Sequence, residues 1–424
     1  MSQGVYGLLG NRLNVVMIPR PETSAIAVWI LTRGGSDYEN AGNNGVNHFL
    51  EHMYFKGTKK RRTPLEIWRA IEGRGGEINA QTDRECVGYG VEMGGGNLEF
   101  TLELLSDILF NSRFDPEDIK LESGVIMEEK MGVNDVPQAE LYELWDKLLY
   151  PDSPWGFPVE GSAENIKNMT REKLMACLEE HYRSNLMVLA VAGKINPEET
   201  MLLANKYFSR AKKGKKPLVI ADTERQGSQQ RISINFRETE QTHLILGVTG
   251  YSLFHPLKCA FELLGIILGG NGSSRLFTTV RGENGLAYDI RTHNHLFTNR
   301  GELATYAGVN HSNVEKTIRA ITKEYKKTAA GEITAEELEC AKEYVLGRMS
   351  RFLEGSSSLA IFFGLKKLFS EPNQTPEEEM EAMKRVSLKD LQLVAQDIFK
   401  KEKFRLVVLG PHKGARQLEK LLIS

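Results

Sequence analysis

An internal repeat constrains the fold of this chain more than any other feature, because a duplicated sequence predicts a duplicated domain. One copy runs NMTREKLMACLEEHYRSNLMVLAVAG in mid-chain, and the other runs RVSLKDLQLVAQDIFKKEKFRLVVLG near the end. In both copies a closing glycine stands 23 positions after a capping residue, Gly193 after Thr170 and Gly410 after Ser387. Each copy predicts an amphipathic helix followed by a strand rich in leucine and β-branched residues.

The repeat divides the 424 residues into two homologous domains, 1–210 and 228–424, joined by a basic linker at 211–227 that is poor in apolar residues. A weaker echo relates DPEDIKLE (115–122) to TAEELECA (334–341), and each string predicts the start of a helix. Strands precede long helices in both halves. This order favours an antiparallel-rich sheet with helices packed on one face, so we predict an α+β fold of two duplicated domains.

Composition excludes several classes of function. With 54 basic and 56 acidic residues the net charge is −2, which gives no indication of nucleic-acid binding. Four cysteines, at positions 86, 177, 259 and 340, never form a CxxC pair. Their scatter argues against a disulfide framework and against a cysteine zinc site, and predicts free thiols.

The expected location follows from what the sequence lacks. The first twenty residues have neither the basic start nor the long apolar stretch of a secretory signal. The longest apolar stretches, such as 186–192, are far too short to span a bilayer. We therefore expect a bacterial-type cytoplasmic protein without a membrane partner, although a mature form trimmed of a targeting segment would look the same.

The string GVNHFLEHMYFKGT (45–58) places two histidines and a glutamate at the spacing of a metal site. Residues four positions apart lie on one face of a helix, so His48 and His52 can reach one ion. Neutral imidazole suits zinc, and a catalytic zinc keeps one position open for water. Glu51 shares that face and can act as a general base without being a ligand. Two core or surface histidines on an amphipathic helix are the alternative.

The H-x-x-E-H order is that of the inverzincins. The longer string HFLEHMYFKGT resembles the family of pitrilysin, insulin-degrading enzyme and mitochondrial processing peptidase. The resemblance covers nearly the whole chain and is closest to the short-chain branch, in which one polypeptide forms half of a clamshell. It implies a zinc metalloendopeptidase with one Zn²⁺ per chain.

The resemblance also implies a third zinc ligand, a glutamate about 76 or 77 residues beyond the second histidine. Glu129 stands 77 residues after His52, while the adjacent Glu128 leaves an ambiguity of one residue. The preceding triplet Val-Ile-Met (125–127) favours Glu129. Glu122 matches a supporting glutamate of the family, which would orient a histidine ligand. The alternative for Glu122 is a solvated helix glutamate.

Two further features gain a function only through the resemblance. The resemblance implies that residues 79–82 form an edge strand beside the zinc. Asn79 and Ala80 of this strand would bind an extended peptide through backbone hydrogen bonds. In SSRLFTTVRGENGLAYDI, Arg281 and Tyr288 stand seven residues apart. The family uses such a pair to hold the substrate backbone and stabilise the oxyanion. Without the resemblance, both features would be interpreted as structural.

The resemblance implies a chamber closed by two chains, in which the zinc domain of one chain faces the Arg/Tyr domain of its partner. A homodimer is the simplest assembly, and a heterodimer with a homologous subunit is the alternative. The implied substrates are unfolded peptides. Two rival interpretations are a non-catalytic or regulatory subunit and a metal protein acting on non-peptide substrates. The retained His48, Glu51, His52 and Glu129 count against the first rival.

Three other patterns predict structure rather than chemistry. The basic run 59–62 is expected to face solvent, and contact with an acidic patch of a partner is the alternative. His293 and His295 alternate as strand residues would, which places both on one face, and no third ligand type follows at a suitable spacing. The glycine-containing string 269–272 lacks the lysine of a phosphate-binding loop.

Overall fold

The structure is a computed structural model that describes residues 3–214, 230–372, 374–412, 414 and 416–423. Most of the expected linker at 211–227 lies outside these residues. The chain forms two compact units, each of which takes a short segment from the other half of the sequence. Unit 1 comprises Met1–Met131, Phe157–Asp222 and Ser350–Glu377, and unit 2 comprises Gly132–Gly156, Thr223–Met349 and Glu378–Ser424.

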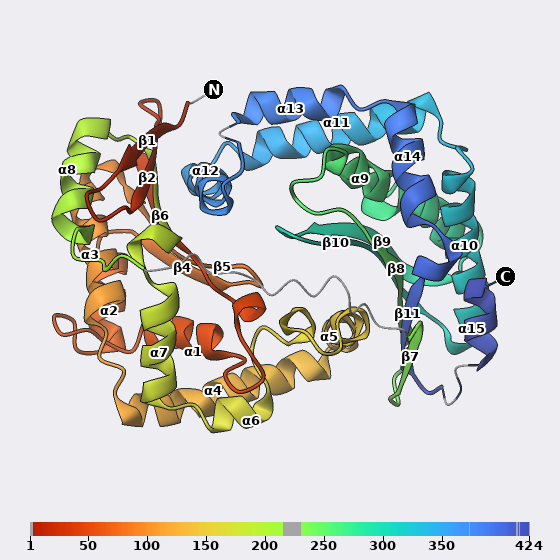
Figure 1. The fold of residues 1–424 in the computed structure, drawn as a ribbon, viewed down its shortest axis with the longest axis horizontal. Helices are drawn as coiled ribbons and strands as arrows, with labels where there is room; N and C mark the ends of the chain where they lie inside the picture. The colour runs from red at the N-terminus through yellow and green to blue at the C-terminus, as the bar shows by residue number, and fades with distance from the viewer. Residues whose placement is uncertain (1–2, 215–229, 373, 413, 415, 424) are drawn as a thin grey trace. The chain divides into compact units, whose positions relative to one another are not determined.

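Unit 1 contains a six-stranded sheet in the order β1-β2-β6-β3-β5-β4. Figure 1 labels every strand of this sheet except β3. All neighbouring strands are antiparallel except β2 and β6. Its strands are β1 Val5–Leu8, β2 Asn14–Pro19, β3 Ala25–Arg33, β4 Glu77–Thr82, β5 Cys86–Gly94 and β6 Met187–Gly193. The helices of the first half are α1 Val46–Met53, α2 Pro64–Glu72, α3 Leu98–Asn111, α4 Pro116–Asp135, α6 Ala163–Lys167, α7 Arg171–His181 and α8 Pro197–Phe208.

The two faces of this sheet are covered by different parts of the chain. Side chains such as Ile26 and Val28 of β3 join one core with residues of α1, α3 and α8. The opposite face is covered by α12 (Ser356–Phe369), which comes from the second half of the sequence. Gly364 allows this approach, because a Cβ there would lie 2.6 Å from a methyl carbon of Leu31. Cover on both faces explains why β3 is buried along most of its length.

Unit 2 contains a five-stranded sheet in the order β7-β11-β8-β10-β9. Only β7 and β11 are parallel neighbours. Its strands are β7 Ile232–Phe236, β8 Thr242–Thr249, β9 Ala287–Leu296, β10 Gly301–Val309 and β11 Arg405–Gly410. The remaining helices are α5 Pro137–Leu149, α9 Lys258–Gly265, α10 Val314–Ala329, α11 Ala335–Phe352, α13 Pro376–Lys384, α14 Leu388–Ile398 and α15 Arg416–Ile423, with π-helical segments at Ile266–Gly270 and Phe277–Glu283.

This second sheet also receives a helix from the other half of the sequence. The helix α5 packs on β8 and β11 and buries Trp145 completely. The indole nitrogen of Trp145 donates a hydrogen bond of 3.0 Å to the buried carboxylate of Glu302. Gly247 leaves room for the ring, since a Cβ at this position would lie 2.9 Å from it.

The predicted repeat and the α+β class are confirmed. Helices cover both faces of each sheet and not one face as expected, because α12 and α5 come from the other half of the sequence to pack on the second face. The side chains of Thr170 and Ser387 cap α7 and α14, and each helix leads to a strand, β6 or β11, held in the middle of its sheet. The strands β2, β6, β3, β5 and β4 of unit 1 thus correspond in order to β7, β11, β8, β10 and β9 of unit 2. The weaker echo is confirmed as well, because α4 and α11 begin at Pro116 and Ala335.

The structure bears on two expectations, one about the cysteines and one about membrane-spanning helices. All four cysteines are free thiols, as predicted. None of the helices in the described ranges is both long and apolar enough to cross a membrane.

Candidate metal centre

The helix that carries the two histidines begins at a backbone position that only glycine fits well. Gly45 has φ +93°, and a Cβ there would lie 2.6 Å from the Cα of Gly161. The buried carboxylate of Glu39 then caps the helix. It accepts hydrogen bonds from the backbone nitrogens of Gly45 and Asn47 at 2.7 and 2.9 Å. Burial raises the pKa of the Glu39 carboxyl group, and these hydrogen bonds oppose the rise. The bonds satisfy backbone N–H groups at the start of α1 that have no partner within the helix.

His48, His52 and Glu129 form the single group of three or more potential ligands found within the described residues. Their ligand atoms all lie within 4.8 Å of one another. Glu129 Oε2 is 3.8 Å from His48 Nε2 and 3.4 Å from His52 Nε2. The histidines come from α1 and the glutamate from α4. Of the two candidate carboxylates in sequence, Glu129 is therefore the one that joins this group.

Glu122 lies behind His52, on the same helix as Glu129. Its Oε1 is 3.1 Å from His52 Nδ1, and its Oε2 forms an ion pair with Lys56 Nζ. Burial opposes ionisation of Glu122, but the hydrogen bonds from His52 and Lys56 bring its pKa below the ordinary value. A carboxylate that accepts a hydrogen bond from Nδ1–H favours the tautomer in which Nε2 is free to bind a metal. The alternative of a solvated helix glutamate is wrong, because Glu122 is buried.

The donor set fits a zinc ion. Burial, with smaller effects from His52 and Lys130, lowers the pKa of His48 to about 4, so this imidazole is neutral at neutral pH. A neutral imidazole can donate its lone pair to a metal, whereas imidazolium cannot. Two imidazole nitrogens and one carboxylate oxygen are ligands that zinc prefers, and three protein ligands leave a fourth position for water.

Glu51 lies on α1 between the two histidines and does not belong to the ligand group. Burial raises the pKa of its carboxyl group, and a hydrogen bond from Thr82 opposes the rise. The hydroxyl of Thr82 donates this bond to Glu51 Oε2 at 2.5 Å. A half-buried carboxylate with a raised pKa, fixed by one neighbour, can accept a proton.

Thr82 ends β4, which is an edge strand because it pairs with β5 alone. Asn79 and Ala80 lie in the middle of β4, opposite Gly90 and Tyr89 of β5. The strand also packs against α1. Its outer edge is therefore available to an extended peptide beside the helix that carries the histidines.

Arg281 and Tyr288 belong to unit 2. Arg281 lies in the π-helical segment Phe277–Glu283 and Tyr288 at the start of β9. The structure brings the pair together, with the guanidinium carbon 5.5 Å from the centre of the tyrosine ring. Tyr288 is 75% exposed, so its hydroxyl is accessible to a ligand.

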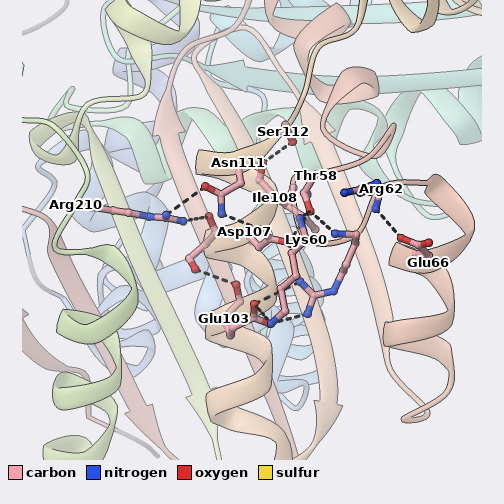
Figure 2. Close-up of polar contacts among 12 residues, drawn as sticks. Thr58, Lys60, Arg62, Glu66, Glu103, Asp107, Ile108, Asn111, Ser112 and Arg210 are labelled. Carbon is pink, nitrogen blue, oxygen red and sulfur yellow. Dashed lines mark hydrogen bonds and ion pairs between the residues drawn. The ribbon is translucent and has the colours of Figure 1, made fainter.

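The expectation that the basic run 59–62 faces solvent is wrong for Arg61, which is buried. Its guanidinium binds Asp107 at 2.8 Å and Glu103 at 2.6 Å. Asp107 also accepts a hydrogen bond from Thr58 at 2.7 Å. Figure 2 shows Glu103 and Asp107 beside Thr58 and Lys60, which belong to the loop between α1 and α2. Arg61 thus fixes the segment that follows α1. The sequence around it, with basic residues on both sides, gave no indication that Arg61 pairs with carboxylates of α3.

His293 and His295 project from one face of β9, as predicted, with ring centres 4.7 Å apart. His295 Nδ1 is 3.1 Å from Glu302 Oε1. Within the described residues, these two histidines and Glu302 are not among the side chains placed closely enough to hold a metal ion.

Comparison with known proteins agrees with this architecture. The profile described as Insulinase (Peptidase family M16) matches residues 14–161, and Peptidase M16 inactive domain matches residues 168–345. A protein of Mycobacterium tuberculosis described as an uncharacterized zinc protease is 31% identical, covering 97% of this chain and 94% of its own length. A similarly described protein of Bacillus subtilis is 29% identical, covering 95% and 96%. The chain therefore belongs to peptidase family M16.

Solved structures show the same fold. A protease from Helicobacter pylori superposes with a TM-score of 0.89 at 24% identity and covers 97% of this chain and 100% of its own. A protein from Pseudomonas fluorescens, described as a peptidase M16 inactive domain, has a TM-score of 0.89 at 18% identity and covers 97% and 98%.

Sequence reasoning missed three residues that position the centre: Glu39, Lys56 and Thr82. Lys56 stands in the string 45–58, and Thr82 stands in the segment 79–82. No spacing rule indicated their contacts, since Glu39 caps a helix across a loop and Thr82 reaches Glu51 from a strand.

Proposed function

We propose that the protein is a zinc-dependent endopeptidase that cleaves unfolded peptides. The observation that carries the proposal is the convergence of His48, His52 and Glu129 within 4.8 Å, next to a half-buried Glu51. Family membership and the description of its relatives as zinc proteases support a hydrolase of this kind. The ligands lie in the region matched by the Insulinase profile, and not in the region matched by the inactive-domain profile.

The residues of the centre have distinct roles in this proposal. A zinc ion held by His48, His52 and Glu129 would activate water and polarise the scissile carbonyl. Glu51 takes a proton from the attacking water and passes it to the leaving amine. Thr82 holds the Glu51 carboxylate in one orientation through its hydrogen bond. The open edge of β4 would align an extended peptide, which gives affinity with little sequence preference.

The assembly is part of the proposal. Arg281 and Tyr288 of the partner subunit would hold the substrate backbone and stabilise the negative charge that develops on the carbonyl oxygen. Since one chain carries both the ligands and this pair, a homodimer with two sites is the simplest arrangement. An enclosed chamber would admit extended peptides and exclude folded proteins. Analytical ultracentrifugation distinguishes a homodimer from a monomer that requires a homologous subunit.

Hydrolysis of a quenched fluorescent peptide library tests the reaction. Wild-type protein and Glu51→Gln are compared, and bound zinc is measured in both by atomic emission. We expect zinc in both proteins and cleavage by the wild type alone. Zinc in both proteins with cleavage by neither would instead indicate a non-catalytic subunit, whose partner would then have to be found.

A matched pair of variants tests the ligand assignment. Glu129→Gln removes the carboxylate of the ligand group, while Glu128→Gln makes the same chemical change one position away. We expect Glu129→Gln to lose zinc and activity, and Glu128→Gln to keep both. Glu122→Gln should weaken zinc binding by about 10- to 100-fold, the usual effect of losing a residue that orients a ligand. Loss of zinc from Glu128→Gln alone would contradict the assignment.

A further inference from the structure

A cavity of about 740 Å³ lies within unit 2. Its walls are β9, the turn at 269–272, the π-helical segment that carries Arg281, and residues of α5 and α11. We propose that this cavity binds a carboxylate group of the peptide substrate, and this inference rests on the peptidase function proposed above.

The cavity is the counterpart in unit 2 of the metal centre in unit 1. Strand β9 is the edge strand that corresponds to β4, and α11 corresponds to α4. Glu129 and Arg348 each stand 13 residues after the first residue of these helices, Pro116 and Ala335. An arginine thus occupies the position of the third ligand. The same framework therefore carries a carboxylate, that of Glu129, in unit 1 and a guanidinium, that of Arg348, in unit 2.

Two guanidinium groups line the cavity without a counter-charge. Arg281 contacts the rings of Phe277 and Tyr288 at 4.9 and 5.5 Å, and Arg348 contacts the ring of Tyr344 at 5.7 Å. Across the ranges that the structure describes, neither guanidinium forms an ion pair or a hydrogen bond. Aromatic rings orient a guanidinium but leave its N–H donors free.

The other charged groups on the wall do not neutralise this pair. Asp289 is the one acidic side chain that lines the cavity, and it already forms an ion pair of 3.0 Å with Arg291. Burial lowers the pKa of His293 to about 4, so its ring is neutral at neutral pH. Arg281 and Arg348 therefore leave the cavity with an excess of positive charge.

The chemistry of these groups selects a carboxylate. A guanidinium matches the two oxygens of a carboxylate in a planar, bidentate arrangement, and charge-assisted hydrogen bonds of this kind are the stronger ones in proteins. The wall is further ordered by Tyr344, whose hydroxyl donates to the carbonyl of Gly270 at 3.3 Å. In a peptide, the carboxylate comes from an acidic side chain or from the C-terminus, and the two sources predict different substrate preferences.

Peptide binding to the zinc-loaded Glu51→Gln protein tests the proposal without turnover. The probes are labelled peptides of one neutral sequence, in which a single glutamate replaces glutamine at each position in turn. Each is made with a free and with an amidated C-terminus. We expect a carboxylate to tighten binding by roughly 10- to 100-fold, the range for hydrogen bonds to charged groups. Tighter binding at one glutamate position indicates a side chain, and tighter binding of free ends indicates the C-terminus.

Arginine variants made in the same background connect the preference to the cavity. Arg348→Gln should abolish it, and Arg348→Lys, which keeps the charge but not the bidentate geometry, should reduce it. Arg385→Gln makes the same change at an exposed position of unit 2 outside the cavity and should retain it. Thermal unfolding monitors the fold of each variant, and Arg348→Lys carries the test if Arg348→Gln does not fold.

The outcomes separate this inference from the peptidase function. Equal affinity for acid and amide forms, or a preference unchanged in both Arg348 variants, overturns the carboxylate site. Cleavage by wild-type protein of the same peptides is measured in parallel. Cleavage without a carboxylate preference refutes the cavity alone. A preference that depends on Arg348, with no cleavage by the wild type, refutes the peptidase and leaves the carboxylate site standing.

Discussion

Replacing Thr82 by valine should slow peptide hydrolysis without removing the metal. Thr82 donates a hydrogen bond of 2.5 Å to Glu51 Oε2, and this bond links the edge strand β4 to the helix α1. Valine has nearly the same shape but no hydroxyl, so the strand should keep its packing. The carboxylate of Glu51 would lose the one side-chain donor that orients it in the part of the protein described by the structure.

The magnitude follows from the type of bond. A hydrogen bond to a charged group contributes about 1.5–3 kcal/mol. If this contribution is lost from the transition state, the rate falls by roughly 10- to 100-fold, because 1.4 kcal/mol corresponds to a factor of ten. Thr82 is not among the ligand group, so the stoichiometry of bound zinc should not change.

Steady-state kinetics on one quenched peptide provide the assay, with bound zinc measured in every preparation. We expect kcat of Thr82→Val to fall while KM stays close to that of the wild type. Thr82→Ser retains the hydroxyl and is the matched control, which should recover most of the activity. The reasoning would be refuted by full activity of Thr82→Val, or by an equal loss in Thr82→Ser.

Three predictions concern stability. Asp107→Ala leaves the buried Arg61 with one carboxylate fewer and should lower the free energy of unfolding, measured in urea, by about 3 kcal/mol. A loss below about 1 kcal/mol, the typical effect of a single substitution, would contradict this prediction. Burial lowers the pKa of His181 to about 4 from 6.5, so the unfolded chain binds more protons between these values. The contribution of His181 to the free energy of unfolding is therefore fully present above pH 6.5 and falls by up to about 1.4 kcal/mol per pH unit on acidification. His181→Gln should flatten this dependence, as measured by urea unfolding of the metal-free protein at pH 7 and pH 5. Gly45→Ala should destabilise unit 1 by more than about 1 kcal/mol and weaken zinc binding, as measured by thermal unfolding and zinc titration, because the new Cβ would collide with Gly161.

Local sequence signals were enough to predict the fold class and the ligand types. The repeat at Thr170 and Ser387 is a local signal, since a cap, an amphipathic helix and an apolar strand are each encoded within a few neighbouring residues. The spacing of His48 and His52 is equally local, because helix geometry alone places both on one face. The third ligand, Glu129, came from a family resemblance, and the structure brings it to the two histidines.

The side chains that surround these residues became known from the folded chain. Thr82 reaches Glu51 from a strand, Glu39 caps the metal-site helix across a loop, and Asp107 pairs with Arg61 from another helix. The exchange of α5 and α12 between the halves likewise has no local signature. Such contacts join residues far apart in sequence, and their formation depends on how whole faces of helices and sheets pack. No periodicity within one segment encodes that packing.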